Sequence, residues 1–192
     1  DTEERDEERR VNAVAINYAR VRRRAQELLA GQRRPPVDLL SITAALGAEI
    51  RHFSLEEDVS GILYRQDDRK IIVVNDKQLA TRQRFTIAHE IGHLALHRGT
   101  PVHVDHNFRV NLRDPDSARG TDVEEIEANA FAANLLMPAT WLRTELRSGL
   151  VDFDDSEEIA ALAARYEVSQ QAMLFRLTSI FARPTEGPGP ER

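Results

Sequence analysis

The sequence predicts an α+β fold in which a small, mainly antiparallel three-stranded sheet packs on helices. Three strand-like runs follow one another, Ala48–Phe53, Gly61–Arg65 and Lys70–Asn75, and the third is strongly β-branched. The last two are joined by Gln66–Arg69, a short polar segment of the kind that closes a hairpin. Apolar residues recur at helical spacing on both sides of these strands. Strands grouped together and flanked by helices are typical of the α+β class.

Composition limits the kinds of protein that this chain can be. Its 192 residues predict one domain, or one domain with a small appendage. A net charge of −6 gives no overall basic field of the kind that attracts nucleic acid. The chain has no cysteine, so any metal site must use histidine and carboxylate ligands. No apolar run approaches the ~20 residues of a membrane span and no signal peptide is visible, so we expect a cytoplasmic protein without a membrane partner.

The most specific pattern in the chain lies on a predicted helix from about Arg82 to about Leu96. Its centre has the form H-E-x-x-H, in which His89 and His93 lie one turn apart on the same face. Two imidazoles at this spacing can hold one Zn²⁺ ion, for which Mn²⁺ is an activating substitute to consider. Glu90 follows the first histidine directly, so its carboxylate can act as a general base without binding the metal.

This five-residue pattern also arises by chance in long helices, and two features favour a metal site over coincidence. Apolar residues flank the pattern at helical spacing, so one side of the helix is buried, where a pair of histidines needs a reason. Gly92 lies in mid-helix, where glycine costs about 1 kcal/mol relative to alanine. A glycine between the two histidines predicts that another segment approaches this face closely.

The third metal ligand must come from another segment, because a catalytic zinc site uses three protein ligands and leaves one position open. His97 does not qualify, since it lies about 12 Å along the helix axis from His89.

A later acidic helix, from Thr121 or Asp122 to Met137, offers carboxylates for this position. Glu125 and Asn129 are four residues apart on one face, so Glu125 can bind the metal while Asn129 hydrogen-bonds a ligating imidazole. For Glu124 and Glu127 we favour a solvated acidic start of the helix. Spacing alone does not separate Glu125 from its neighbours as the third ligand.

The segment between these helices, Val102–Gly120, is polar and predicts a long loop. His103 and His106 lie in it, and either can stabilise an oxyanion, contact substrate or serve as an alternative ligand. A surface position is favoured for both. Tyr166 is a further candidate for the oxyanion role.

The N-terminal part predicts a charged, disordered start at Asp1–Arg10 and a helix over Val11–Ala30. A second short helix is expected over Asp38–Leu46. Four basic residues cluster on the first helix, which indicates a solvated face or, alternatively, a patch for an acidic partner or DNA: Arg20, Arg22, Arg23 and Arg24.

Taken together, these motifs resemble the ImmA/IrrE metallopeptidases, and the resemblance covers about Pro35 to Ile180. Its most specific marks are Gln83–His97 and the run from Ala128 to Pro138, which reads Ala-Asn-Ala-Phe-Ala-Ala-Asn-Leu-Leu-Met-Pro. Further marks precede them: Pro35–Asp38, Ser60-Gly61 and Ile72–Asn75.

This resemblance implies a gluzincin-like zinc peptidase with His89, His93 and Glu125 as zinc ligands and Glu90 as catalytic base. It also implies a protein substrate. Well-studied members of the family cleave helix-turn-helix repressors of the XRE type and release the repressed genes, in mobile-element transfer or in the response to DNA damage. We expect an edge of the sheet formed by Ala48–Asn75 to orient the scissile segment by strand addition.

A helix-turn-helix-like element follows the peptidase core in such proteins, and helices over Glu157–Tyr166 and Gln170–Phe181 are expected here. The domain organisation predicted is residues 1–34 as a charged segment and helix, 35–147 as the zinc-peptidase core, 148–182 as the helix-turn-helix-like subdomain and 183–192 as a disordered tail.

Two other functions remain open at this point. One is a DNA-binding regulator, although only Arg165 and Arg176 are basic in the last two helices, which is a poor basis for binding phosphate. The other is a partner-binding module, such as a toxin–antitoxin component, with a non-catalytic zinc site.

Overall fold

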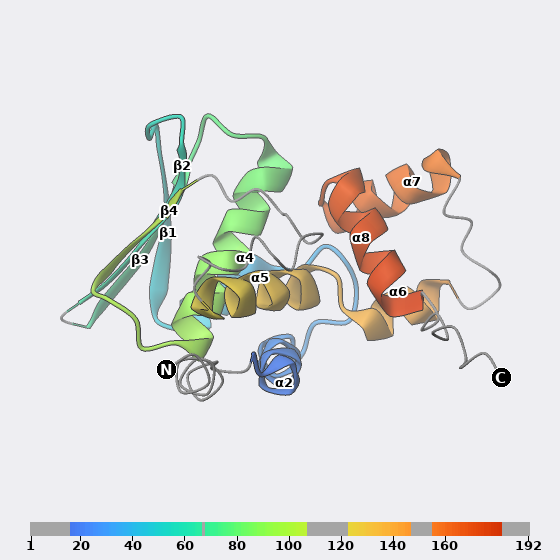
Figure 1. Ribbon diagram of the computed structural model, residues 1–192, viewed down its shortest axis with the longest axis horizontal. Helices are drawn as coiled ribbons and strands as arrows, with labels where there is room; N and C mark the ends of the chain where they lie inside the picture. Colours follow the sequence, from blue (N-terminus) through green and yellow to red (C-terminus); the bar gives the residue numbers. More distant parts are fainter. Residues whose placement is uncertain (1–15, 67, 107–122, 147–154, 182–192) are drawn as a thin grey trace, which may run out of the picture.

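The computed structural model describes residues 16–66, 68–106, 123–146 and 155–181 (Figure 1). The expected charged start, the helix start at Thr121 or Asp122, most of the 102–120 segment and the Pro/Gly-rich tail lie outside the described residues. The helices are α2 Tyr18–Leu28, α3 Leu39–Ala45, α4 Ala80–Leu96, α5 Val123–Leu136, α6 Ala139–Glu145, α7 Ser156–Tyr166 and α8 Gln170–Phe181. The strands are β1 Ala48–Phe53, β2 Val59–Gln66, β3 Arg69–Asn75 and β4 Val102–His106.

The sheet is mixed rather than mainly antiparallel, and it has four strands in the order β1-β3-β2-β4. β2 and β3 form the expected hairpin, with Leu63 opposite Ile72. β1 lies beside β3 and runs parallel to it, with Ile50 opposite Ile72. Local patterns do not reveal this pairing, because β1 pairs with β3 and not with β2, the strand that follows it in sequence.

The expectation of three strands with a loop from Val102 is therefore wrong at β4. This strand pairs antiparallel with β2, with Ile62 opposite Val104, and forms one edge of the described sheet. It alternates half-buried or buried His103 and Asp105 with exposed Val102 and Val104. Its apolar residues thus point to solvent and its polar ones inward, which is the reverse of the usual strand pattern and explains why the sequence indicates a loop.

Helix α4 passes between the sheet and α5, and glycines make room for it on both sides (Figure 1). A Cβ atom at Gly61 of β2 would come within 2.5 Å of the Thr86 methyl group of α4. A Cβ atom at Gly92 of α4 would come within 3.1 Å of Cα of Ala128 and of the Phe131 ring of α5. The close approach that the glycine between the two histidines predicts is therefore made by α5.

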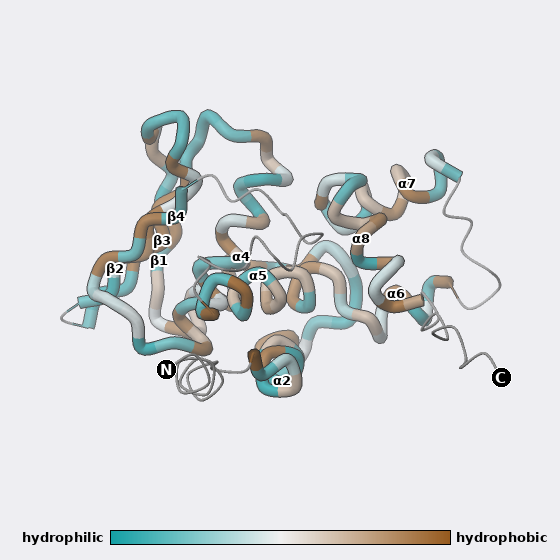
Figure 2. Tube along the Cα trace, in the orientation of Figure 1, coloured by the Kyte–Doolittle hydropathy of each residue, from teal (hydrophilic) through white to brown (hydrophobic). Residues whose placement is uncertain are grey.

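The apolar core runs through the whole described fold, from α2 to α8. Figure 2 shows apolar stretches along the strands and along the helices that face them. α2 packs across α5 through Val21 and Ala25, which are both buried. The C-terminal helices α7 and α8 pack on each other and share this core through Tyr166 and Leu177. This continuous core fixes α4 and α5 relative to one another.

The turn between α7 and α8 consists of three residues, in which Glu167 takes up the left-handed conformation that ends α7. Asp155 begins α7, since its side chain accepts hydrogen bonds from the backbone N–H groups of Glu157 and Glu158. Arg84 of α4 forms an ion pair with Glu167 at 3.1 Å, which ties the turn to the metal-motif helix. Among the described residues, the helices are all too short or too polar to cross a membrane.

The contact at Gly92 gives a direct test of the packing. Gly92→Val should lower the free energy of unfolding by about 1–3 kcal/mol, because the new side chain meets the α5 backbone, which cannot yield cheaply. Ala80→Val places the same side chain at an exposed position of α4 and should change stability by less than about 0.5 kcal/mol. Urea denaturation followed by circular dichroism measures both, and equal effects of the two substitutions would contradict the packing.

Candidate metal centre

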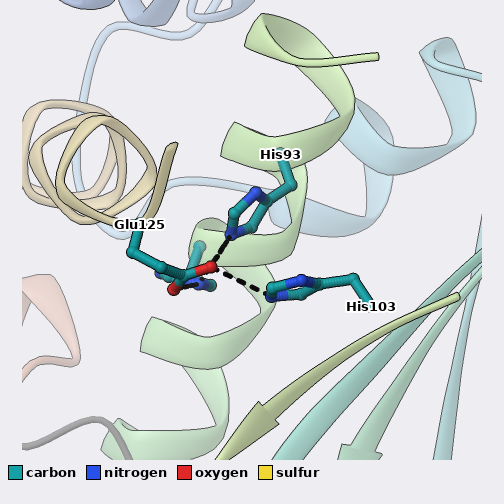
Figure 3. Close-up of side chains that lie close together, drawn as sticks. His93, His103 and Glu125 are labelled. Carbon is teal, nitrogen blue, oxygen red and sulfur yellow. Dashed lines mark hydrogen bonds and ion pairs between the residues drawn. The ribbon is translucent and has the colours of Figure 1, made fainter. Parts of the chain in front are cut away.

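The structure brings His89, His93 and Glu125 together between α4 and α5. Glu125 Oε2 lies 3.3 Å from His89 Nε2, and Glu125 Oε1 lies 3.1 Å from His93 Nε2. The two imidazole Nε2 atoms are 3.0 Å apart. Figure 3 shows Glu125 reaching from α5 toward His93 of α4. Ligating atoms of all three side chains thus converge on one point, with both histidines 1% exposed.

Asn129 orients the imidazole of His89. Its side-chain amide nitrogen donates to the backbone carbonyl of Glu125 at 2.6 Å, which leaves Oδ1 facing His89 Nδ1 at 2.9 Å. Because Oδ1 can only accept, the proton of a neutral His89 sits on Nδ1 and its Nε2 presents a lone pair to the cluster. This is the arrangement in which an outer polar residue fixes the tautomer of a ligating imidazole.

His93 is oriented from behind by His97 and Glu127. Glu127 Oε2 accepts a hydrogen bond from His97 Nε2 at 3.0 Å. His97 Nδ1 then faces His93 Nδ1 at 3.3 Å and, in its neutral form, accepts the proton from it. His93 Nε2 is thereby left with a lone pair toward the cluster. His97 is too distant to share a metal with His89, but it acts on the site through His93.

The expectation that Glu127 is solvated is wrong. Its side chain is 6% exposed, and it accepts hydrogen bonds from the Arg20 guanidinium at 2.7 Å and from the backbone N–H of Asn17 at 2.9 Å. Burial tends to raise the pKa of Glu127, but the hydrogen bonds from Asn17, His97 and Arg20 hold it below its usual value. The carboxylate therefore stays ionised and joins α2 to the back of the site.

The basic cluster on α2 is accordingly divided. Arg20 binds Glu127, whereas Arg23 and Arg24 form exposed ion pairs with Glu27 of their own helix. These last two pairs fit the solvated face that the sequence favours.

The charge state of the cluster suits a cation. Burial alone would raise the pKa of Glu125, but the adjacent imidazoles of His89 and His93 hold it far below its usual range, so the carboxylate is ionised. Burial lowers the pKa of His93 to about 4, so this ring is neutral. Burial likewise acts to lower the pKa of His89, but the bond to Glu125 and the nearby carboxylates raise it. The pocket thus favours a positive charge among its nitrogen and oxygen atoms.

Glu90 is the least satisfied group of the site. It is completely buried, and neither of its carboxylate oxygens has a hydrogen-bond partner within the described structure. Burial raises its pKa to about 8, against the effect of His89 and together with the negative charges of Asp105 and Glu125. A buried carboxylate without partners requires an explanation, and a group bound between it and the neighbouring cluster supplies one.

Strand β4 adds two residues on the side facing α4. His103 Nε2 lies 3.2 Å from Glu125 Oε1, as Figure 3 shows. Asp105 is 5% exposed, and its carboxylate belongs to a group with His89 and Glu90 whose ligating atoms lie within 4.8 Å of one another.

The structure does not bring His106 or Tyr166 to the cluster. His106 lies on the opposite face of β4, where it is exposed and pairs with Asp58 at 3.6 Å. The Tyr166 hydroxyl donates to Glu145 Oε1 at 3.1 Å, and its ring is fully buried in the core. Their polar groups therefore have other partners, which argues against an oxyanion role for either.

Arg65 of β2 fixes the end of α4 beside the site. Its Nη1 donates to the backbone carbonyls of His93 and His97, each at 3.1 Å, and its Nε donates to that of Thr100 at 3.0 Å. The last carbonyl groups of a helix need such partners and favour positive charge.

Sequence reasoning misses the roles of Asp105, Arg65 and the His97–Glu127 pair. For the pair a signal exists, because His97 follows His93 by one turn and Glu127 follows Glu125 closely on the partner helix. No local signal marks the other two, since their positions depend on how β2 and β4 pair.

The donor set of this cluster fits a divalent metal ion. His89, His93, His103 and Glu125 offer four ligating atoms within 4.8 Å of one another. The nitrogen lone pairs and the ionised carboxylate therefore point into one small volume. Imidazole nitrogen and carboxylate oxygen are the ligands that zinc accepts in catalytic sites.

Comparison with known proteins agrees with this geometry. Residues 43–178 match the Peptidase M78 family, which is described as the IrrE N-terminal-like domain. The chain therefore belongs to the IrrE-like metallopeptidase family, and this membership implies a metal ion.

Among the relatives are two radiation response metalloproteases IrrE. The protein of Deinococcus radiodurans is 34% identical over 113 residues, which are 58% of this chain and 31% of that protein. The protein of Deinococcus deserti is 35% identical over 119 residues, which are 61% of this chain and 39% of that protein. The match thus spans well under half the length of either relative.

Two further similarities come from a phage and from a solved structure. The uncharacterized immunity region protein 2 of Bacillus phage phi105 is 29% identical over 106 residues, which are 54% of this chain and 60% of that protein. A Mycobacterium tuberculosis transcriptional regulator superposes with a TM-score of 0.53 and 16% identity, over 86% of this chain and 48% of that one. The structural likeness concerns the fold alone.

The role of Glu127 behind His93 gives a test of the site. Glu127→Gln keeps a hydrogen-bond acceptor for Arg20 but removes the negative charge that orients His97. Metal affinity, measured by competition with a coloured chelator, should fall about 10–100-fold, as for other outer partners of ligating histidines. Glu157→Gln, at an exposed glutamate of α7, should leave the affinity unchanged. Unaltered affinity in Glu127→Gln would show that His93 needs no support from this carboxylate.

Proposed function

We propose that this protein is a zinc-dependent endopeptidase in which His89, His93 and Glu125 hold the metal and Glu90 is the catalytic base. The observation that carries the proposal is the buried, unpartnered carboxylate of Glu90 beside three converging metal ligands. A structural metal site needs no such group, whereas hydrolysis requires a base within reach of the attacking water.

Each residue then has a defined part in hydrolysis. Zinc supplies Lewis-acid activation of water and of the scissile carbonyl. Glu90 takes a proton from the attacking water at a carboxylate oxygen and returns it to the leaving nitrogen. The buried position of Glu90, directly after His89 on α4, places its carboxylate beside the cluster for this exchange. Asn129 and the His97–Glu127 pair keep both imidazoles in the tautomer whose Nε2 carries a lone pair toward the cluster.

The substrate that we propose is a helix-turn-helix repressor of the XRE type, whose cleavage releases genes of a stress response or a mobile element. Membership in the IrrE-like family supports a protein substrate. The names of the relatives, a radiation response metalloprotease and an immunity region protein of a phage, support a regulatory setting of this kind.

An edge of the sheet is suited to hold the substrate. The sequence predicts this edge within Ala48–Asn75, whereas the edge beside the site is formed by β4, which lies beyond β2. β4 covers β2, so the edge beside the site belongs to β4. The backbone N–H of Arg65 bonds to the carbonyl of Pro101, and antiparallel pairs alternate. The N–H and C=O groups of Val102 and Val104 therefore point away from β2, where an added peptide strand would find them.

A DNA-binding role for the helices of the proposed 148–182 subdomain has less support. Arg165 forms an ion pair with Glu145 at 2.8 Å. Arg176 is part-buried and donates to the Met137 carbonyl and to Asn134 Oδ1. Both basic side chains in the described part of this segment are thus engaged within the protein, and contact with a nucleic-acid backbone would require other groups.

The role of Glu90 predicts a loss of activity without loss of metal. Glu90→Gln should bind zinc as tightly as the native chain and cleave a repressor substrate at least about 10²-fold more slowly, because glutamine cannot accept the proton. Glu56→Gln, at an exposed glutamate before β2, should cleave at the native rate. Mass spectrometry of the products measures both rates. Native-like cleavage by Glu90→Gln would refute the assignment of the base.

Strand addition at β4 predicts a dependence on one backbone N–H group. Val104→Pro removes an outward N–H but no bond to β2, so kcat/KM should fall by roughly fivefold to tenfold, the worth of about one hydrogen bond. Val104→Thr changes the side chain but keeps the N–H, and its kcat/KM should stay within about twofold of the native value. Equal values for the two variants would exclude substrate pairing at this position.

A further inference from the structure

His103 occupies the side of the metal cluster that α4 and α5 leave to the sheet. Its ring centroid lies 4.3 Å from that of His93 and 6.5 Å from that of His89. Figure 3 shows the ring extending from β4 toward Glu125, on the side opposite the α5 backbone. His103 is therefore the component of the cluster that comes from the sheet rather than from either helix.

The spacing of the four ligating atoms matches a closed coordination shell. Four ligands about 2.0–2.1 Å from one zinc ion stand about 3.3–3.4 Å apart at the corners of a tetrahedron. In the structure, Nε2 of His89 and of His93 are 3.0 Å apart, Glu125 Oε2 lies 3.3 Å from His89 Nε2, and Glu125 Oε1 lies 3.1 Å from His93 Nε2. His103 Nε2 lies 3.2 Å from the same Oε1, which is within this range, and all four ligating atoms lie within 4.8 Å of one another.

His103 Nε2 also forms no hydrogen bond in the described structure that would explain its position. The atom is buried, and its approach to Glu125 Oε1 at 3.2 Å lacks the geometry of a hydrogen bond, although the side chain as a whole is 23% exposed. Unsatisfied ring nitrogens in buried positions are uncommon and point to a missing ligand. A residue that served only to pack β4 against α4 would not need an imidazole aimed at a carboxylate and two further imidazoles.

The attachment of His103 is weaker than that of the two histidines on α4. His89 and His93 are 1% exposed on a long helix, whereas His103 lies on a five-residue strand at the sheet edge. The pairing of β4 with β2 is irregular between Val59 and Gly61, so the ladder is interrupted just past Asp105. A shift of β4 would therefore move His103, whereas His89 and His93 are held on α4.

We propose that His103 is a displaceable fourth metal ligand, so that the resting site is closed and opens when β4 shifts. Catalysis at such a centre requires one open position, which His103 would block. A peptide that adds to the β4 edge bears directly on the strand that carries His103. Substrate pairing and opening of the metal site are thereby coupled, which deepens the proposed peptidase function and rests on it.

This arrangement restrains the enzyme in the absence of its substrate. A closed coordination shell leaves no position on the metal for water or for the carbonyl of a small peptide. Unstructured chains that do not pair with β4 are therefore not cleaved. Specificity then comes from the energy of strand pairing, which is available only to segments that can extend along the edge.

The number of imidazoles bound to zinc tests the inference without any variant and without an activity measurement. Zinc X-ray absorption of the zinc-loaded native protein should show four nitrogen or oxygen ligands, three of them imidazoles. A native centre with two imidazoles would overturn the inference, whatever the activity.

Two variants on the same strand make the measurement specific. His103→Ala should reduce the imidazole count to two and weaken zinc binding by at least tenfold in chelator competition, because a direct ligand contributes no less than an outer partner. His106→Ala, on the other face of β4, should change neither value. Unchanged affinity and imidazole count in His103→Ala would again overturn the inference.

Activity then separates this inference from the proposed function. His103→Ala, saturated with zinc, should cleave a short generic peptide faster than the native protein, since its shell is open. A slower reaction with an unchanged imidazole count would instead assign His103 to the substrate oxyanion and overturn the ligand role. If the native protein binds zinc through three imidazoles but cleaves no candidate repressor, the closed site is supported and the proposed peptidase function is refuted.

Discussion

The convergence of unprotonated imidazole nitrogens and a carboxylate at separations of 3.0–3.3 Å is the constraint on which the rest of this structure depends. Such atoms repel one another unless a cation lies among them, so the surrounding protein must force them together. It does so by stacking α4 closely on α5 at Gly92, where even a Cβ atom would come within 3.1 Å of Cα of Ala128. Asn129 and His97 then hold the backs of the two rings. The packing of α4 on α5 thus determines the site, because it brings the ligating side chains within reach of one another.

Much of this site can be predicted from local sequence, because it depends on helical periodicity. Positions one turn apart place His89 with His93, and Glu125 with Asn129, on common faces, and the observed contacts follow those faces. Gly92 is informative for the same reason, since a costly residue in mid-helix indicates a close neighbour. The ends of α3, α7 and α8 also lie where capping residues and turns suggest.

The remainder could not be predicted because it depends on contacts between segments distant in sequence. Glu127 has the composition of a solvated helix start, and only the packing of α2 on α5 buries it against Arg20. The parallel pairing of β1 with β3 is decided by competition among strands of similar character. β4 shows an inverted polarity because its inward residues serve the site, so a rule based on burying apolar residues assigns it to a loop.

The sheet contributes more than a scaffold for the two helices. Arg65 of β2 binds three carbonyl groups at the end of α4, and β4 brings His103 and Asp105 to the cluster. The candidate metal centre therefore draws residues from β4, α4 and α5, and a displacement of the sheet edge would move His103 and Asp105. In the proposed function, binding of a substrate strand and the chemistry of the centre are joined through this edge.

Anomalous diffraction at the zinc absorption edge, from crystals of the zinc-loaded protein, tests the central claim most directly. The account predicts a single strong peak about 2.0–2.1 Å from Nε2 of both His89 and His93 and from a carboxylate oxygen of Glu125. His93, His97 and Glu124 form another group that could hold an ion. A peak in that group instead, or no ordered zinc between α4 and α5, would contradict the account.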